Sequence, residues 1–185
     1  RAFADLTAAA LLLPTPGPPP GLAVVASVDA AGRPTPALGE RAPSLDRAGR
    51  LVAFEAGSNG AGSNVLVRDL WSATTIVASL TPAGKVQDYT AWRPSLSADG
   101  RLVAFDGWSA GLVPGDTNEA QDVFVRDLVA RTTDRVSVAT DGTQANQGGW
   151  LATLSADGST VLFASASTNL VRGDTNRRTD IFALG

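Results

Sequence analysis

The sequence lacks two residue types that carry much of enzyme chemistry: its 185 residues include no cysteine and no histidine. Without cysteine, disulfide bonds, thiolate zinc sites and cysteine nucleophiles are excluded. Without histidine, the commonest general base, the Ser-His-Asp triad and most transition-metal sites are excluded as well. These absences argue against catalysis, and we expect a protein that is not an enzyme.

Positive charge is also scarce. The chain has 15 Lys and Arg against 18 Asp and Glu, which gives a formal net charge of −3. A chain of this kind lacks the basic footprint of proteins that bind nucleic acid or anionic membranes, so we expect neither as a partner. Hydrophobic residues make up 44% of the chain, which is enough for a buried core.

The apolar run Ala8–Leu13 is far shorter than the roughly 20 residues that a membrane-spanning helix requires. With Arg1 as a charged flank, it is consistent with the core of a signal peptide. The alternatives are a surface segment or a strand left from an earlier repeat. The proline-rich stretch 14–21 is expected to be a stiff linker. Because the first residue is Arg1, we expect a processed product or a piece of a longer protein.

An internal repeat dominates the rest of the sequence. Leu96–Gly100 (LSADG) recurs at Leu154–Gly158, and Gly115–Asn118 (GDTN) recurs at Gly173–Asn176, in both cases 58 positions later. Residues 43–54 are a further copy of residues 94–105, located 51 positions earlier. Self-similarity at a period near 50 residues predicts a repeat architecture.

The central repeat contains four short segments with strand character. Asp99-Gly100 joins the first two, and Asp-Gly between apolar segments is typical of a hairpin whose glycine takes a positive φ. Four antiparallel strands per repeat are typical of one β-propeller blade. We therefore predict an all-β fold of propeller blades. The expected strands of this blade are residues 94–97, 101–105, 123–126 and 132–138.

The predicted domain organisation has two parts. Twelve strands would make about three blades if the N-terminal strand completes the last one, and closed propellers usually have roughly four to eight blades. We therefore expect either part of a larger propeller or two copies that pair in a six-bladed ring. The predicted parts are an N-terminal segment with a proline-rich linker (1–21) and the repeats (22–185), divided into a fourth strand (22–29), two blades (43–80 and 94–138) and an incomplete blade (152–183).

The motif PSLSADGRLVAF at residues 94–105, followed by DVFVRDL at residues 122–128, resembles the TolB-type, WD-like propeller repeat of bacterial proteins. The resemblance covers about residues 22–185. The first copy departs from it, with Arg47-Ala48-Gly49 at the hairpin and Asn64 in place of Asp122. The resemblance implies a six- to eight-bladed propeller in the full protein, a periplasmic or secreted location, and a role as a docking platform for other proteins. Related propellers also stand beside peptidase domains.

The GDTN loops are the candidate metal sites. Calcium prefers hard oxygen ligands, and an Asp-x-Asn-x-x-x-Asp spacing places three oxygen-bearing side chains on one compact loop. The alternative is that these side chains form turns that satisfy loop amides, with the last Asp starting the next strand. Arginines beside the second loop make calcium binding there less favourable. The candidate ligands are Asp116, Asn118 and Asp122 in the central blade, and Asp174, Asn176 and Asp180 in the last one.

Tyr89, Trp92, Arg93 and Trp150 are the candidate binding residues. They lie just before the first strands of two successive blades, where the connections between blades gather on one face of a propeller. Tryptophan, tyrosine and arginine dominate the energetics of protein interfaces, so we expect this face to contact a protein partner. The alternative is that the tryptophans wedge between blades.

From these observations we expect a non-enzymatic, extracytoplasmic propeller module that binds or scaffolds proteins, with no cofactor apart from the calcium hypothesis. Two other functions stay open. One is a calcium-stabilised structural repeat domain, and the other is the propeller portion of a larger hydrolase.

Overall fold

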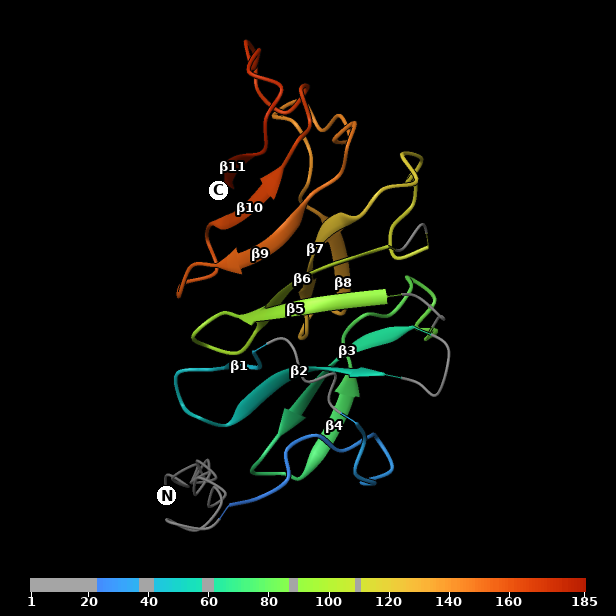
Figure 1. Ribbon diagram of the computed structural model, residues 1–185. Helices are drawn as coiled ribbons and strands as arrows, with labels where there is room; N and C mark the ends of the chain where they lie inside the picture. The colour runs from blue at the N-terminus through green and yellow to red at the C-terminus, as the bar shows by residue number, and fades with distance from the viewer. Residues whose placement is uncertain (1–22, 37–41, 58–61, 87–89, 109–110) are drawn as a thin grey trace, which may run out of the picture.

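The computed structural model describes residues 23–36, 42–57, 62–86, 90–108 and 111–185. Within these ranges the regular structure consists of β-strands joined by turns, and no helix occurs that could cross a membrane. The strands form three blades stacked on one another, with β1–β4 at the bottom of Figure 1 and β9–β11 at the top. The all-β propeller prediction is confirmed.

Each blade is an antiparallel sheet. A single parallel pair, Ser63 with Thr90, connects the first two blades into one hydrogen-bonded array. Blade 1 contains β1 (Ser44–Leu45), β2 (Leu51–Gly57), β3 (Ser63–Asp69) and β4 (Thr74–Val77). Blade 2 contains β5 (Thr90–Leu96), β6 (Leu102–Trp108), β7 (Asp122–Asp127) and β8 (Thr132–Arg135). Blade 3 contains β9 (Trp150–Leu154), β10 (Val161–Ser165) and β11 (Asp180–Leu184).

The register makes positions in the three blades equivalent. Phe105 pairs with Phe124 across β6 and β7, and Phe163 pairs with Phe182 across β10 and β11. In each pair the ring centroids are 5.8 Å apart. Equivalent positions in blades 2 and 3 are 58 residues apart, as the sequence repeat predicts. The recurring phenylalanines therefore belong to the core.

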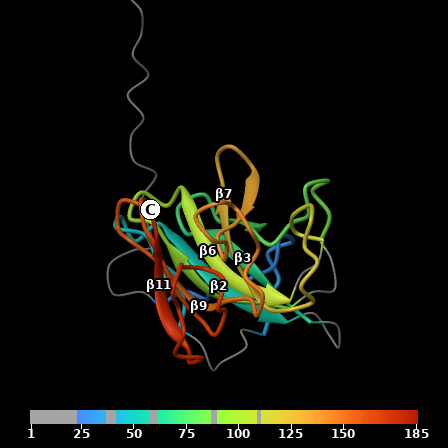
Figure 2. The same cartoon turned by 90° about the horizontal axis from the view of Figure 1, so that it is seen from above.

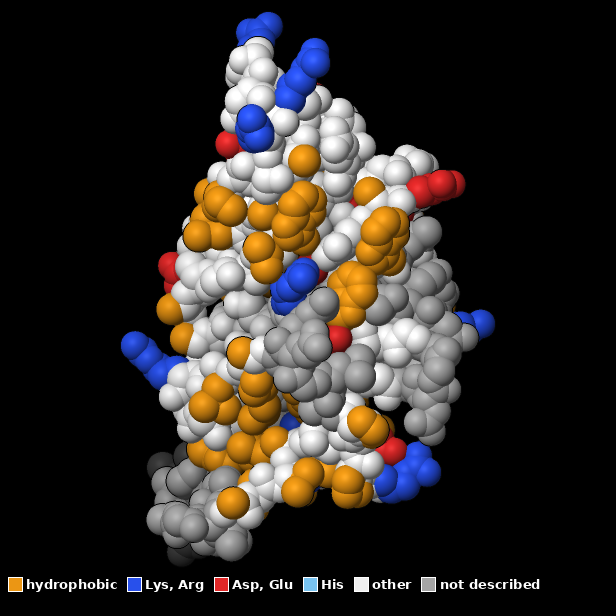
Figure 3. Space-filling view, in the orientation of Figure 1, with side chains coloured by type: hydrophobic (Ala, Val, Ile, Leu, Met, Phe, Trp, Pro, Cys, Tyr) orange, Lys and Arg blue, Asp and Glu red, His pale blue; other side chains and the backbone are white. Residues whose placement is uncertain are grey.

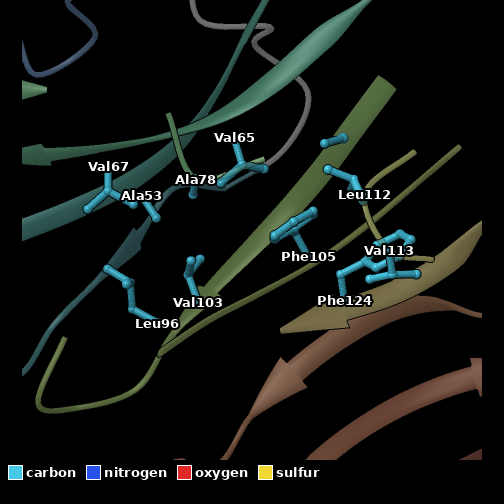
Figure 4. Packing of buried hydrophobic residues seen from close by; sticks show 11 residues of the cluster. Ala53, Val65, Val67, Ala78, Leu96, Val103, Phe105, Leu112, Val113 and Phe124 are labelled. Carbon is cyan, nitrogen blue, oxygen red and sulfur yellow. The ribbon is translucent and has the colours of Figure 1, made fainter. Parts of the chain in front are cut away.

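Two hydrophobic cores lie between the blades. The first joins Ala53 and Val65 of blade 1 to Val103 and Phe105 of blade 2, as Figure 4 shows. The second joins the opposite face of blade 2 to blade 3 and includes Ala104, Val123 and Phe163. Seen from above, strands of successive blades lie over one another (Figure 2). Because a blade has two apolar faces, each one needs a neighbour on both sides.

Hydrogen bonds repeat along the stack together with the cores. The amide of Leu96 donates to Ser44 Oγ at 2.9 Å, and the equivalent amide of Leu154 donates to Ser95 Oγ at 3.0 Å. Near the hairpin turns, the amide of Ala98 donates to the carbonyl of Ala156 at 2.7 Å. The blades therefore meet in one fixed register.

The predicted fourth strand at 22–29 is not formed within the described residues 23–29. Val28 instead makes an isolated bridge with Pro34, as Leu80 does with Val86 and Val138 with Gln144. The repeated sequence therefore encodes the turn that follows a fourth strand. For the same reason β8 ends at Arg135 rather than at the predicted residue 138. Residues 23–25 pair with no strand among the described residues, and a strand without a neighbour is not stable.

Candidate functional site

Two of the predicted binding residues lie on β5, and a third lies on β9. Trp92 pairs with Asp106 in β6, and Trp150 pairs with Ala164 in β10 at the equivalent position. Both tryptophans are partly buried. Tyr89 lies outside the described residues. The structure therefore brings Trp92, Arg93 and Trp150 to the same end of their two blades, where β5 and β9 begin.

A β-bulge directs the residue after each tryptophan. The register shifts between Trp92 and Ser95, and Arg93 has a φ of 50°. Leu151, its equivalent in blade 3, has a φ of 60°. A positive φ is uncommon for residues other than glycine, and bulges often redirect a side chain. The bulge is a feature of the repeat, because both blades share this backbone conformation. The side chain at the bulge differs between them.

Arg93 is held by a carboxylate that has no exposed surface. Its Nη1 donates to Asp106 Oδ2 at 2.7 Å, and the side chain of Arg93 is 31% exposed while that of Asp106 is 0% exposed. Gln121 Nε2 donates to the same oxygen. Burial raises the pKa of Asp106, although the charge and hydrogen bond of Arg93 and the backbone amide of Ala152 in blade 3 act to lower it. This network connects the start of β5, the loop before β7 and the next blade.

The arginine–aspartate pair is specific to blade 2. The equivalent positions hold Ala42 and Glu55 in blade 1, and Leu151 and Ala164 in blade 3. The repeat therefore does not require this pair. Residues that depart from a structural repeat are where function is most often located.

Arg93 also lines a groove, called here the axial groove, that runs along the first strands of all three blades. Its volume is about 440 Å³. Blade 2 contributes Arg93, Pro94 and Ser95, while blade 3 contributes Leu151 to Thr153. Leu151 is 51% exposed, which leaves an apolar side chain at the rim of the groove. The remaining lining residues are Ala42, Pro43 and Ser44 of blade 1.

The first GDTN loop forms a compact polar cluster around Asp122. Asp116 and Asp122 share Arg135, whose Nη1 lies 3.4 Å from Asp116 Oδ1 and 3.9 Å from Asp122 Oδ2. Gln144 Nε2 donates to the same two oxygens, at 2.8 Å and 3.3 Å. Asn118 Nδ2 donates to the carbonyl of Ala145 at 2.9 Å. Burial raises the pKa of Asp122, and the charge of Asp116 raises it further against the hydrogen bond of Ser137.

This cluster does not fit a calcium ion. Arg135 already supplies the positive charge, and donors occupy oxygens that calcium would need. In the second loop, Asn176 Nδ2 donates to Asp180 at 2.8 Å, and the amide of Asn176 donates to Asp174 Oδ1 at 3.3 Å. Among the described residues, no group of three or more acidic side chains is placed to hold a metal. We therefore derive no function through calcium.

The acidic residues that end the third strands, Asp69 and Asp127, cap the turns that follow. Asp127 accepts the amides of Val129 and Ala130 at 2.8 Å, and Arg101 Nη2 at 2.7 Å. The hydrogen bond from Arg101 is the largest of the effects that lower the pKa of Asp127 to about 2. The turn and the pairing with Arg101 therefore give this carboxylate a structural role.

Sequence reasoning missed the partners of both clusters, namely Asp106, Gln121, Arg135 and Gln144. One signal was present for Asp106: it is an acidic residue in an otherwise apolar strand, Leu102–Trp108. Such a residue is buried with a partner or is exposed at an edge. For Arg135 and Gln144 the sequence carried no signal, because their contacts depend on how β8 and its turn fold back onto the loop.

Comparison with known proteins identifies the fold. No protein-family model matches the chain, and no curated protein matches its sequence. Among solved structures, a putative TolB from Agrobacterium tumefaciens aligns with 13% identity and a TM-score of 0.52 over 76% of this chain and 43% of that one. TolB from Acinetobacter baumannii aligns with 18% identity and a TM-score of 0.48 over 77% and 29%.

The β-propeller domain of the Trilobed protease from Pyrococcus furiosus also aligns, with 16% identity and a TM-score of 0.43 over 66% of this chain and 33% of that one. The chain spans less than half the length of these three solved proteins. At such low identities the likeness concerns the fold alone. The chain therefore has the β-propeller fold of TolB-type structures, as its repeat motifs predict.

Proposed function

We propose that this chain is a non-enzymatic propeller module that binds a protein partner at the end of the blades where β5 and β9 begin. The observation that carries the proposal is the Arg93–Asp106 pair, which only blade 2 has and which fixes a partly exposed arginine at the rim of the axial groove. Interfaces are enriched in arginine and aromatic residues of this kind.

The surroundings of Arg93 support an apolar contact. Leu151 is about half exposed, and Trp108, which pairs with Thr90 at the same end of blade 2, is 52% exposed. Trp92 and Trp150, at the same end of their blades, are partly buried. Large side chains held by a rigid sheet lose little conformational entropy when they bind a partner.

The charge of the site indicates the chemistry of the partner. Because Asp106 neutralises Arg93, the groove offers a directional donor without a net positive charge. An extended protein segment with apolar side chains and free backbone carbonyls suits this arrangement better than a nucleic acid, which needs unpaired basic residues. We place the module outside the cytoplasm of a bacterium, in keeping with the TolB-type resemblance.

Surface variants test the proposal without disturbing the core. Short random peptides displayed on phage are selected on the immobilised chain, and the enriched peptides are titrated by fluorescence anisotropy. Leu151→Asn keeps a residue that tolerates positive φ, and Trp108→Ala removes an exposed ring. Each is expected to weaken binding by about tenfold or more. The control is Val129→Asn, at a side chain that is 75% exposed in the β7–β8 turn at the other end of the blade.

Binding should change little between low and moderate salt, because the site carries no net charge. Peptides that bind equally well to wild type, Leu151→Asn and Trp108→Ala would contradict the proposed site. A selection that yields no peptide dependent on either residue would do the same.

A further inference from the structure

The outward face of blade 3 exposes side chains whose equivalents are buried in the other blades. Leu162 is 45% exposed and Ile181 is 68% exposed. The residues equivalent to Leu162, Ala53 and Ala104, are 0% exposed, and so are those equivalent to Ile181, Val65 and Val123. Hydrophobic side chains gather over β9 and β10 in Figure 3. Blade 3 therefore exposes the same face that, in blades 1 and 2, is covered by the next blade.

The structure shows what fills that face elsewhere. The outward face of blade 1 packs against Leu96, Val103 and Phe105 of blade 2. The outward face of blade 2 packs in the same way against Leu154, Val161 and Phe163 of blade 3. Blade 1 carries the same leucine, valine and phenylalanine at 45, 52 and 54. Its Leu45 is 57% exposed, so this inward face is open at Leu45, whereas Phe54 is 5% exposed and packs with Leu66.

The hydrogen bonds between blades continue in the same way. Ser44 and Ser95 each accept an amide from the next blade. Their equivalent in blade 3 is Thr153, which is exposed. The amide equivalent to those of Leu96 and Leu154 is that of Leu45. One end of the stack thus carries the acceptor and the other end carries the donor.

Among the described residues no fourth strand pairs with β11, and residues 23–36 have the sequence of a fourth strand with its turn. Ser79 donates to Asn64 at 2.8 Å, and Ser137 donates to Asp122 at 2.6 Å, and each bond joins the residue just beyond the fourth strand to the third strand. The equivalent acidic residue in blade 3 is Asp180, and the equivalent serine is Ser27. The spacing agrees: Leu80 to Leu96 and Val138 to Leu154 are both 16 positions, and Val28 to Leu45 is 17.

The N-terminal turn already lies where a preceding blade would place it. The turn after β4, with Pro82 and Gly84, lines a pocket with Arg126 of blade 2. Residues 33–36 line a pocket with Asn64 and Leu66 of blade 1. In both cases a turn that follows a fourth-strand sequence lies against the third strand of the next blade.

We propose that two copies of this chain form a closed ring, in which blade 3 of one copy packs against blade 1 of the other and takes residues 23–25 of that copy as its fourth strand. Two identical interfaces, related by a two-fold axis, bury both exposed faces. Each interface continues the contact that already joins blades 1, 2 and 3. The inference is independent of the proposed binding function.

The first measurement is the mass in solution by light scattering coupled to gel filtration. The expected species has twice the 18.9 kDa mass of one chain. Ile181→Lys should convert it to the single-chain mass, whereas Val129→Lys, at a residue that is exposed in the β7–β8 turn, should leave it unchanged. A wild-type monomer, an open series of larger species, or a dimer that Ile181→Lys does not affect would overturn the proposal.

Cross-linking tests the strand exchange and does not depend on whether the lysine variant folds. Val125 pairs with Asp134 in blade 2, so the equivalent pair across the interface is Ala183 with Val24. Because the chain has no cysteine, a mixture of Val24→Cys and Ala183→Cys chains can form a disulfide only at the introduced positions. We expect a covalent dimer on oxidation, and none when Val24→Cys is mixed with Val129→Cys.

The double variant Val24→Cys/Ala183→Cys distinguishes pairing of residues 24 and 183 between two chains from pairing within one chain. The ring predicts covalent dimers. A disulfide within one chain, or no cross-link between residues 24 and 183 in either format, would overturn the proposal.

Discussion

Asp106 connects the charge of the proposed binding site to the stability of the fold. Its carboxylate has no exposed surface, and burial raises its pKa despite the facing guanidinium of Arg93. A buried ion pair of this kind is costly to desolvate and contributes little net stability. Its value is positional, because the pair fixes Arg93 at the groove.

The raised pKa predicts how stability depends on pH. Between the ordinary value of 3.8 and the higher value in the folded state, the native protein holds a proton that the unfolded chain has lost. The contribution of Asp106 to the free energy of unfolding should therefore fall as the pH rises through this interval. Asp106→Asn should remove this contribution in urea unfolding measured across acidic pH. The control is Asp134→Asn, at an exposed carboxylate in β8; equal pH profiles for wild type and Asp106→Asn would contradict the prediction.

The connections between blades hold the loops of the site in place. Gly148, in the connection before β9, has a φ of 69°, and a Cβ there would overlap the carbonyl oxygen of Gln121. That carbonyl accepts the amide of Gly149 at 2.7 Å. Gln121 also donates to Asp106, so this glycine supports the arginine–aspartate pair from the neighbouring connection.

Two glycine variants separate backbone strain from crowding. Gly142→Ala places a Cβ in open space at a φ of 83°, so it should cost about 1–2 kcal/mol through strain alone. Gly148→Ala carries the same strain and must also displace Gln121, which should cost about 1–3 kcal/mol more. Urea unfolding of both variants measures the difference. Similar losses of stability would contradict the prediction, because they would show that the Gln121 loop moves aside at no cost in free energy.

The whole molecule behaves as a short stack in which each blade depends on its neighbours. The cores and the serine hydrogen bonds recur between blades 1 and 2 and between blades 2 and 3. Stability should therefore reside largely in the interfaces between blades.

Substitution of the serines tests this view. Ser44→Ala and Ser95→Ala each leave a largely buried amide without its acceptor, and each should lower the free energy of unfolding by about 1–3 kcal/mol. Thr153→Ala changes the equivalent position at the exposed end of the stack, so under conditions that keep the chain monomeric it should have little effect. Thermal unfolding at matched concentration gives the comparison. A loss at Thr153 equal to that at Ser95 would contradict it.

Much of the architecture could be predicted because it is encoded over short distances. Asp99-Gly100 and its copies set the hairpins, and the apolar segments around Phe105 and Phe163 set the faces of the sheets. Residues 23–29 form no strand among the described residues, and the isolated bridge of Val28 with Pro34 shows the turn that the same residues encode. Whether a strand forms ahead of that turn depends on a neighbour that the local sequence does not specify.

The sequence by itself determined the repeat unit and the all-β fold. Turn chemistry and the alternation of apolar residues act between near neighbours, so they can be read locally. The tertiary structure alone decided that Asp106 holds Arg93, that Arg135 lies beside Asp116 and Asp122, and that Leu162 and Ile181 are exposed on blade 3. These outcomes depend on side chains brought together across strands and blades, where burial and charge compensation select the partners.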